Sequence, residues 1–227
     1  MKNAAPASSR LNEVTDVSDL LAACLDELPT ADRRGDHRVG NRDSGVVLIT
    51  ALSTPIGVMI AGTTADGVCV LEFASTADPR AQLRRLSLQL RCTFVRGRTS
   101  AGELLERELA SYYAGELREF TVPIFLVGSA FQKSVWEALR LIPFGQTRSY
   151  GDQAVGLGKP NAVRAVGHAN GQNPISVIVP CHRVIGADGR LTGYGGGLWR
   201  KRWLLRHEGA AFRDEDLQTT LAFGDAD

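Results

Sequence analysis

Three short strand-like runs precede a series of helical patterns, and this order constrains the fold more than any other feature of the chain. Apolar residues cluster over 46–52, 58–62 and 68–73, and the turn-forming residues between these runs predict hairpins. Helical stretches follow near 80–91 and 102–114. Strands followed by helices predict an α+β fold that begins with a small domain of sheet and helix. The stretch 121–126 predicts a crossing strand or a linker.

The second half of the chain is helical. Residues 131–141, 150–157 and 161–169 predict three helices, with a turn at 158–160 between the last two. Two short helices across a Gly-containing turn are typical of a helix-turn-helix, whose second helix normally faces DNA. Small residues keep that helix slim, which suits close approach to a groove wall or to another helix. They are Ala162, Ala165, Gly167 and Ala169.

A chain of 227 residues is long enough for two domains with separate cores. We expect an N-terminal extension over 1–44, with one short amphipathic helix and a polar linker, and an α+β domain over 45–125. A C-terminal domain over 126–212 and an acidic tail over 213–227 follow.

Positive charge is concentrated in the second half. The formal net charge is only +1, yet residues 129–209 hold 11 Lys and Arg against 4 Asp and Glu. This local excess suits a polyanionic partner, although a solvated basic face would give the same count. The side chains expected to meet phosphates are Lys133, Arg148, Lys159, Arg190, Arg200 and Arg202.

The four cysteines, Cys24, Cys69, Cys92 and Cys181, form no CxxC pair, so the sequence indicates neither a disulfide framework nor a zinc motif. No apolar run approaches the roughly 20 residues of a membrane span, and the N-terminus lacks an apolar signal core. We therefore expect a soluble, cytoplasmic protein without membrane association, in which Cys181 stays reduced.

Cys181 is a candidate nucleophile. It follows Pro180 and the apolar run 177–179, and a strand-like run that ends at a proline can set a thiol at the floor of a pocket. A structural role is the alternative, because free cysteines are usually buried and inert. A reactive thiol needs a neighbouring base or positive charge to hold the thiolate.

His182 and Arg183 follow Cys181 directly. Neighbouring residues of an extended chain point to opposite faces, so we expect His182 to act on the sulfur through a turn or a bridging water. Glu208, at the end of an apolar helical stretch, could hold one imidazole nitrogen and stabilise the imidazolium. Spacing alone leaves this arrangement open, because a Glu before a Gly is also common at an exposed helix C-terminus.

Motifs throughout the second half carry a resemblance. They are Phe131-Gln132, Val135-Trp136, Ile142-Pro143 with Gly145, Ser149-Tyr150, 162–167 (AVRAVG), Asn173-Pro174, 179–184 (VPCHRV), Gly193-Tyr194, Lys201, Leu204-Leu205 and 207–209 (HEG). In these motifs the chain resembles the O6-alkylguanine-DNA alkyltransferases, also called methylated-DNA-protein-cysteine methyltransferases. The turn 53–57 adds a weaker match to the N-terminal domain of that family.

The resemblance implies a DNA repair protein that flips O6-alkylguanine out of duplex DNA and transfers the alkyl group irreversibly to Cys181, once per molecule. It also implies that the C-terminal domain is winged helix-turn-helix-like and combines DNA binding with catalysis. His182 and Glu208 would be the base and its orienting carboxylate. Tyr150 would donate to the departing guanine, and Lys201 would support that polarisation.

The resemblance assigns further residues to binding. Arg164 would occupy the space left by the flipped base, and Ala162, Ala165 and Gly167 would lie with it in the minor groove. Asn173 would tie the turn after this helix to the cysteine segment. The remaining pocket and structural positions are Pro180, Arg183, Val184, Tyr194 and Gly195. Gly195 stands where relatives often have a serine, which removes a hydroxyl and keeps the backbone N–H.

The implied partner is double-stranded DNA that contains O6-alkylguanine, with O4-alkylthymine as a further lesion, and the implied state is a monomer. No cofactor is implied. Some relatives hold a structural zinc in the N-terminal domain, but residues such as Gly45 and Thr64 stand at the matching places, so we expect none here.

Three other functions stay open on the sequence. A winged-helix regulator would bind duplex DNA by sequence and ignore the lesion. A non-catalytic relative would carry tryptophan at the cysteine position, which Cys181 argues against. A cysteine hydrolase would need an oxyanion hole and turnover, and adjacent Cys and His are poor geometry for direct base action.

Overall fold

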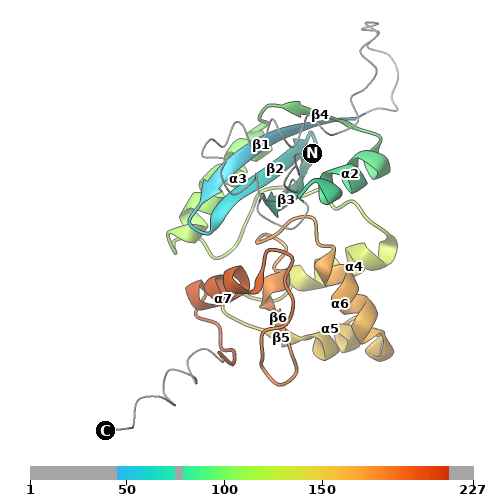
Figure 1. Cartoon of the computed structure of the whole chain (residues 1–227), viewed down its shortest axis with the longest axis vertical. Helices are drawn as coiled ribbons and strands as arrows, with labels where there is room; N and C mark the ends of the chain where they lie inside the picture. Colours follow the sequence, from blue (N-terminus) through green and yellow to red (C-terminus); the bar gives the residue numbers. More distant parts are fainter. Residues whose placement is uncertain (1–44, 75–78, 215–227) are drawn as a thin grey trace, which may run out of the picture. The chain divides into compact units, whose positions relative to one another are not determined.

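The computed structural model describes residues 45–74 and 79–214, and these form two compact units (Figure 1). The first unit holds the described residues up to Gly128 together with Pro174–Ser176, and the second holds Ser129–Asn173 and the described residues from Val177 onward. The helix expected within 1–44 and the tail beyond 214 lie outside the described residues.

The first unit is built on a four-stranded sheet of β1 (Val46–Thr54), β2 (Gly57–Thr64), β3 (Gly67–Phe73) and β4 (Thr93–Arg96). The strand order is β3-β2-β1-β4; β1, β2 and β3 pair antiparallel, and β4 pairs parallel to β1. The two predicted hairpins are therefore confirmed. The second needs glycine at position 67, where φ is +133° and a Cβ would lie 2.4 Å from a backbone oxygen.

Two helices, α2 (Pro79–Leu90) and α3 (Ser100–Tyr113), cover opposite faces of this sheet. Ile60 packs in one buried cluster with Leu83 of α2. Its neighbour Met59 lies 3.9 Å from the hydroxyl of Tyr113 at the end of α3. Successive side chains of a strand point to opposite faces, so the two helices enclose the sheet from both sides and bury its apolar residues.

The stretch 121–126 is a linker with one isolated bridge, from Ile124 to Val68, and is not a full strand. The β4 strand was not predicted from the sequence. It has only four residues, two of which are exposed, so its apolar pattern is too short to distinguish from a turn.

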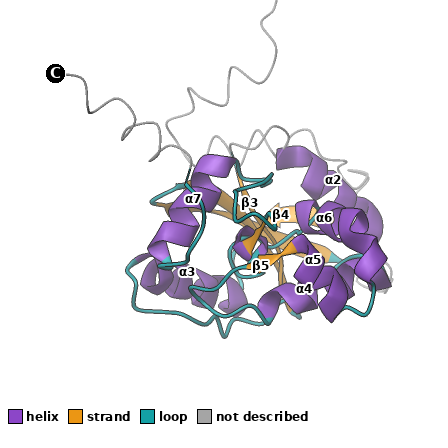
Figure 2. Ribbon diagram, turned by 90° about the horizontal axis from the view of Figure 1, so that it is seen from below, coloured by secondary structure: helices purple, strands orange, loops and turns teal. Residues whose placement is uncertain are grey.

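The second unit holds the helices α4 (Ala130–Arg140), α5 (Tyr150–Gly156), α6 (Val163–Gly171) and α7 (Leu198–His207). It also holds the 3₁₀ turns η2 (Pro160–Ala162) and η3 (Cys181–Arg183) and two short strands, β5 (Arg148–Ser149) and β6 (Val184–Ile185), which pair in parallel. Figures 1 and 2 show β5 between α7 on one side and the group of α4, α5 and α6 on the other.

Sequence signals explain where α4 and α5 begin. The Ser129 hydroxyl accepts a hydrogen bond from the backbone N–H of Gln132, and the backbone N–H of Ser129 donates to the Gln132 side-chain oxygen. Ser149 and Asp152 repeat this capping box. The helix-turn-helix is confirmed, but its second helix begins at Val163 instead of 161. Pro160 occupies the first position of the preceding 3₁₀ turn η2, and this turn takes up the residues before α6.

Buried polar contacts fix α6 against its neighbours. The indole N–H of Trp136 on α4 donates to the carbonyl of Ala169 at 2.8 Å, and the amide of Asn170 donates to Gln153 on α5 at 2.7 Å. The sheet-and-helix unit and the helical unit together confirm the predicted α+β fold class. No helix within 45–74 and 79–214 is long and apolar enough to cross a membrane.

Candidate active site

Cys181 lies in the tight turn η3, and it is only 9% exposed. The strand-like reading of 177–179 is wrong: these residues form a turn, with Val177 at a φ of +73°. Burial explains the error, because Val177 and Val179 are apolar core residues that pack from a turn as well as they would from a strand. The N–H of Cys181 donates to the Val179 carbonyl at 2.9 Å, which keeps the turn tight.

Glu208 contacts two buried side chains that follow the cysteine, His182 and Arg183. Its carboxylate lies 2.9 Å from Nε2 of His182, and Arg183 donates to it through Nε at 2.8 Å and through Nη2 at 3.0 Å. Arg183 also donates to the carbonyl of Ile142 at 2.6 Å. From the sequence, Glu208 could also have been an exposed residue at a helix end. In the structure it is buried at the C-cap of α7.

These contacts set the protonation states. Burial by itself raises the pKa of Glu208, but the hydrogen bonds and charges of His182 and Arg183 outweigh it and hold that pKa well below its usual range. Burial lowers the pKa of His182, although its bond to Glu208 acts in the opposite direction. We therefore assign an ionised Glu208 beside a neutral imidazole.

The neutral imidazole has a defined tautomer. A carboxylate can only accept, so Nε2 of His182 carries the proton and donates to Glu208, and Nδ1 keeps its lone pair. Nδ1 is buried and has no hydrogen-bond partner among the described residues. A buried base in this tautomer can take the thiol proton, and the sequence analysis expects the route to be a turn or a bridging water.

Asn173 holds the cysteine segment from the other side. Its amide donates to the Val179 carbonyl at 2.7 Å and to the sulfur of Cys181 at 3.2 Å. This is the tie between the turn after α6 and the cysteine segment that the resemblance implies. A donor to sulfur also favours the thiolate over the thiol.

Cys181 opens onto a pocket of about 510 Å³. The opposite walls come from the second helix of the helix-turn-helix and from the glycine-rich stretch before α7. The lining residues are Tyr150, Val163, Arg164, Gly167, Asn170, Gly171, Cys181, Thr192, Gly193, Tyr194 and Gly195. Pockets of about 300–1,000 Å³ commonly bind small organic groups, so this one is large enough for such a group.

Tyr150 and Lys201 do not meet directly. The hydroxyl of Thr192 donates to that of Tyr150 at 3.0 Å, whereas Nζ of Lys201 donates to the carbonyls of Val184 at 2.6 Å and Thr192 at 3.1 Å. Burial lowers the pKa of Lys201 to about 8, although the charge of Cys181 raises it. The expected support of Tyr150 by Lys201 is thus indirect and passes through Thr192.

The small residues predicted for the second helix lie in different environments. Gly167 faces the pocket, where a Cβ would lie 3.6 Å from the Tyr150 ring, and Arg164 lines the same pocket with an exposed side chain. Ala165 is exposed and Ala162 is partly buried in η2, and neither lines the pocket. Ala169 is buried against Trp136, so that position serves helix packing.

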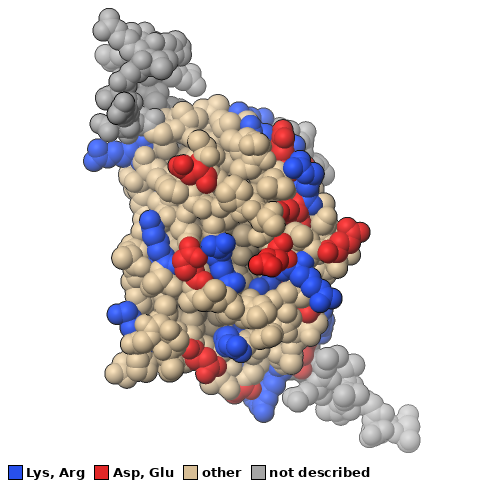
Figure 3. All heavy atoms as spheres, turned by 180° about the vertical axis from the view of Figure 1, so that it is seen from behind, with Lys and Arg blue, Asp and Glu red and all other residues tan. Residues whose placement is uncertain are grey.

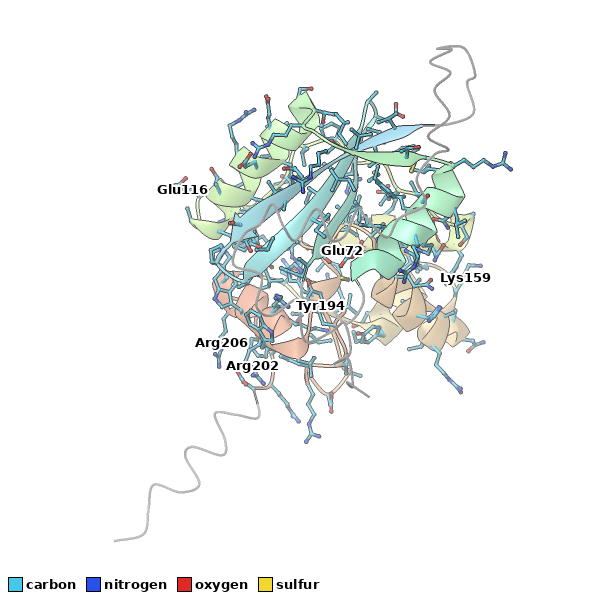
Figure 4. The ribbon with its side chains drawn as sticks, turned by 45° about the horizontal axis from the view of Figure 1, so that its top comes forward. Glu72, Glu116, Lys159, Tyr194, Arg202 and Arg206 are labelled. Carbon is cyan, nitrogen blue, oxygen red and sulfur yellow. The ribbon has the colours of Figure 1, made fainter. Side chains whose placement is uncertain are left out.

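Two of the six side chains expected to meet phosphates are engaged by other groups of the protein. Arg200 is 6% exposed, donates to the Gly196 carbonyl at 2.7 Å and stacks on Trp199. Arg202 pairs with Asp214, as does Arg206 one turn further along α7. Figure 4 labels the two arginine side chains. Lys133, Arg148, Lys159 and Arg190 are exposed. On the face drawn in Figure 3, positive and negative side chains are interspersed.

Sequence reasoning missed four pocket residues: Val163, Asn170, Gly171 and Thr192. None carries an unusual local signal, because a Val, an Asn, a Gly and a Thr near short helices are ordinary. They become pocket residues only where the chain folds back to place 192–195 opposite α6. Within the described ranges, no group of three or more His, Cys, Asp or Glu side chains could hold a metal ion.

Comparison with known proteins agrees with the resemblance found in the sequence of the second unit. The sequence model described as 6-O-methylguanine DNA methyltransferase, DNA binding domain, matches residues 130–210. The crystal structure of the Mycobacterium tuberculosis O6-methylguanine methyltransferase is 42% identical, with a TM-score of 0.62 over 76% of this chain and 99% of that one. The methylated-DNA-protein-cysteine methyltransferase of Methanosarcina acetivorans is 58% identical over 104 residues, which are 46% of this chain and 67% of the relative.

The chain belongs to the methylated-DNA-protein-cysteine methyltransferases. Another member, from Mycolicibacterium paratuberculosis, is 61% identical over 101 residues, and the match spans about 61% of its length and 44% of this chain. An M. tuberculosis member whose crystal structure is a complex with DNA is 42% identical, with a TM-score of 0.60 over 73% of this chain and 92% of that one.

Proposed function

We propose that this methyltransferase-family protein repairs DNA by moving the alkyl group of O6-alkylguanine onto its own Cys181. One observation supports the proposal most strongly: a single pocket is lined by the candidate nucleophile and by Arg164 and Gly167 of the helix-turn-helix. DNA that binds to α6 would therefore present a base directly to the sulfur of Cys181. Family members are named for this transfer, and a similar M. tuberculosis protein forms a complex with DNA.

The reaction follows from the charges around the sulfur. His182 removes the thiol proton through Nδ1, and Glu208, kept ionised by Arg183, stabilises the imidazolium that forms. The thiolate attacks the alkyl carbon, a C–S bond forms, and the bond from carbon to O6 breaks with its electron pair moving to the purine. Tyr150 donates to the purine ring as that charge develops.

The product explains a single turnover. A thioether on Cys181 has no polarised carbonyl that water could attack, and no group in the described pocket could remove the alkyl chain. Each molecule therefore reacts once, and the protein is a stoichiometric enzyme.

Access to the alkyl group requires base flipping, because O6 lies inside the base stack. Arg164 is exposed at the edge of the pocket, where its guanidinium can enter the duplex in place of the flipped base. We propose that the protein acts as a monomer in the cytoplasm on O6-alkylguanine, and that O4-alkylthymine is a second substrate.

Mass spectrometry after incubation with a duplex that contains one O6-methylguanine tests the function. We expect one methyl group per protein molecule on the peptide that contains Cys181, and none on Cys69 or Cys92, which are buried in the first unit. Cys181→Ala should accept nothing while still binding the duplex. A protein that stays unmodified while retaining sequence-specific duplex binding would instead be a lesion-independent regulator.

A further inference from the structure

Thr192 contacts the proposed proton donor of the reaction. Its hydroxyl donates to the hydroxyl of Tyr150 at 3.0 Å, and both residues line the pocket that Cys181 opens onto. A hydroxyl that accepts this bond keeps its own proton free for another acceptor. The proton of Tyr150 is then available to a base that enters the pocket.

The backbone of Thr192 is held in place from behind. Nζ of Lys201, a fully buried side chain of α7, donates at 3.1 Å to the Thr192 carbonyl and at 2.6 Å to that of Val184. Val184 directly follows the turn that carries Cys181. Lys201 therefore sets the distance between the nucleophile turn and the wall that holds Thr192, and this wall sets the position of the Tyr150 hydroxyl.

We propose that Thr192 is a positioning residue for alkyl transfer: its hydroxyl orients Tyr150 and stabilises the charge that develops on the phenol oxygen as guanine departs. The inference rests on the proposed function. In the step itself, the C–S bond forms, the bond from carbon to O6 breaks, and the purine accepts a proton from Tyr150. This leaves a phenolate on Tyr150 and an imidazolium on His182, so the charges balance, and return of the imidazolium proton to the phenolate through water completes a net transfer of one proton from sulfur to guanine.

The exposure of Thr192 decides where its effect should be seen. Without DNA the residue is exposed, so its hydrogen bond competes with water and adds little to the stability of the fold. A base that fills the pocket excludes that water, and a hydrogen bond in the dry site becomes stronger. Burial and the charge of Cys181 raise the pKa of Tyr150, whereas the Thr192 bond lowers it. The bond should therefore change the rate of transfer and leave unfolding unchanged.

The test uses single-turnover rates of methyl transfer at saturating duplex, measured alongside thermal unfolding. Thr192→Val keeps the shape of the side chain without the hydroxyl, and we expect a rate about 3- to 10-fold lower. Thr192→Ser restores the hydroxyl and should recover most of the rate. Thr147→Val is the matched control, because the Thr147 hydroxyl bonds to the Ala211 carbonyl outside the pocket and should leave the rate unchanged.

A double-mutant cycle identifies the partner. In a Tyr150→Phe background, Thr192→Val should have little further effect, because the hydroxyl that it serves is already absent. Fully additive losses would overturn the proposal, as would a Thr192→Val variant as fast as wild type or a Thr192→Ser variant as slow as Thr192→Val. If wild-type protein accepts no methyl group at all, the proposed function fails instead, so the two failures are distinguishable.

Discussion

Nε2 of His182 lies 2.9 Å from the carboxylate of Glu208, and both side chains are fully buried. Arg183 donates two hydrogen bonds to the same carboxylate. These bonds keep Glu208 ionised and fix its orientation toward the imidazole. The pair fixes both the tautomer of His182 and the charge that can form on it.

Glu208→Gln should slow alkyl transfer about 10- to 100-fold without abolishing it, which is part of the roughly 10²- to 10⁴-fold effect of a positioned base. The amide retains one acceptor oxygen but brings an N–H group against Arg183 or His182, and it cannot stabilise an imidazolium. The single-turnover rate on methylated duplex measures this loss. Glu137→Gln on the surface of α4 is the control, because its ion pair with Arg140 is exposed. An unchanged rate in Glu208→Gln would remove the carboxylate from the mechanism.

Stability should fall in two stages as the pH is lowered. The folded-state pKa of His182 lies below its usual 6.5, so below pH 6.5 the unfolded chain binds more protons at this site and stability declines. The folded-state pKa of Glu208 lies below its usual 4.5, so its contribution is present above pH 4.5 and is lost as the pH falls further.

Urea unfolding measured from pH 7 to pH 3 follows both stages. Glu208→Gln should flatten the decline below about pH 4.5 and keep the decline that begins near pH 6.5. A variant whose stability falls as steeply as that of wild type below pH 4.5 would show that Glu208 is not the titrating group.

Arg164→Ala should lose much more rate on duplex substrate than on free O6-alkylguanine. Extrusion of a base costs a few kcal/mol, and a free base carries no such cost, so the duplex rate should fall by roughly tenfold or more at saturation. Lys159→Ala is the comparison, because that exposed residue precedes η2 and does not line the pocket. It should weaken binding and reduce the salt dependence while the saturated rate stays near wild type. Equal losses for Arg164→Ala on both substrates would reject insertion into the duplex.

Gly145→Ala should destabilise the fold more than Gly158→Ala. Both glycines have positive φ values, +76° and +67°, at which an L side chain costs about 1–2 kcal/mol. At Gly145 the added Cβ would also lie 2.8 Å from the carbonyl oxygen of Glu208, whereas at Gly158 it meets nothing within 4 Å. Thermal unfolding of the two variants measures the difference. If the two variants lost equal stability, the backbone at Glu208 would have to move freely, and Glu208 could then not hold His182 in a fixed position.

Local signals were sufficient for the larger elements. Capping residues such as Ser129 and Ser149 and turn residues such as Gly67 act within a few positions of sequence, so the hairpins, α4, α5 and the helix-turn-helix could be predicted. The short strands β4, β5 and β6 could not, because two to four residues carry too little periodicity and gain their pairing only from distant partners.

The sequence by itself determined the order of the longer strands and helices, the family and the candidate nucleophile, because hydrophobic period, turn chemistry and motifs such as PCHR are local properties of the chain. Only the tertiary structure decided that residues 177–179 turn, that Arg200 is buried, and that Lys201 reaches Tyr150 through Thr192. The physical reason is distance along the chain. Glu208 meets His182 across 26 residues and Thr192 meets Tyr150 across 42, and such contacts arise only when packing of the whole unit brings their elements together.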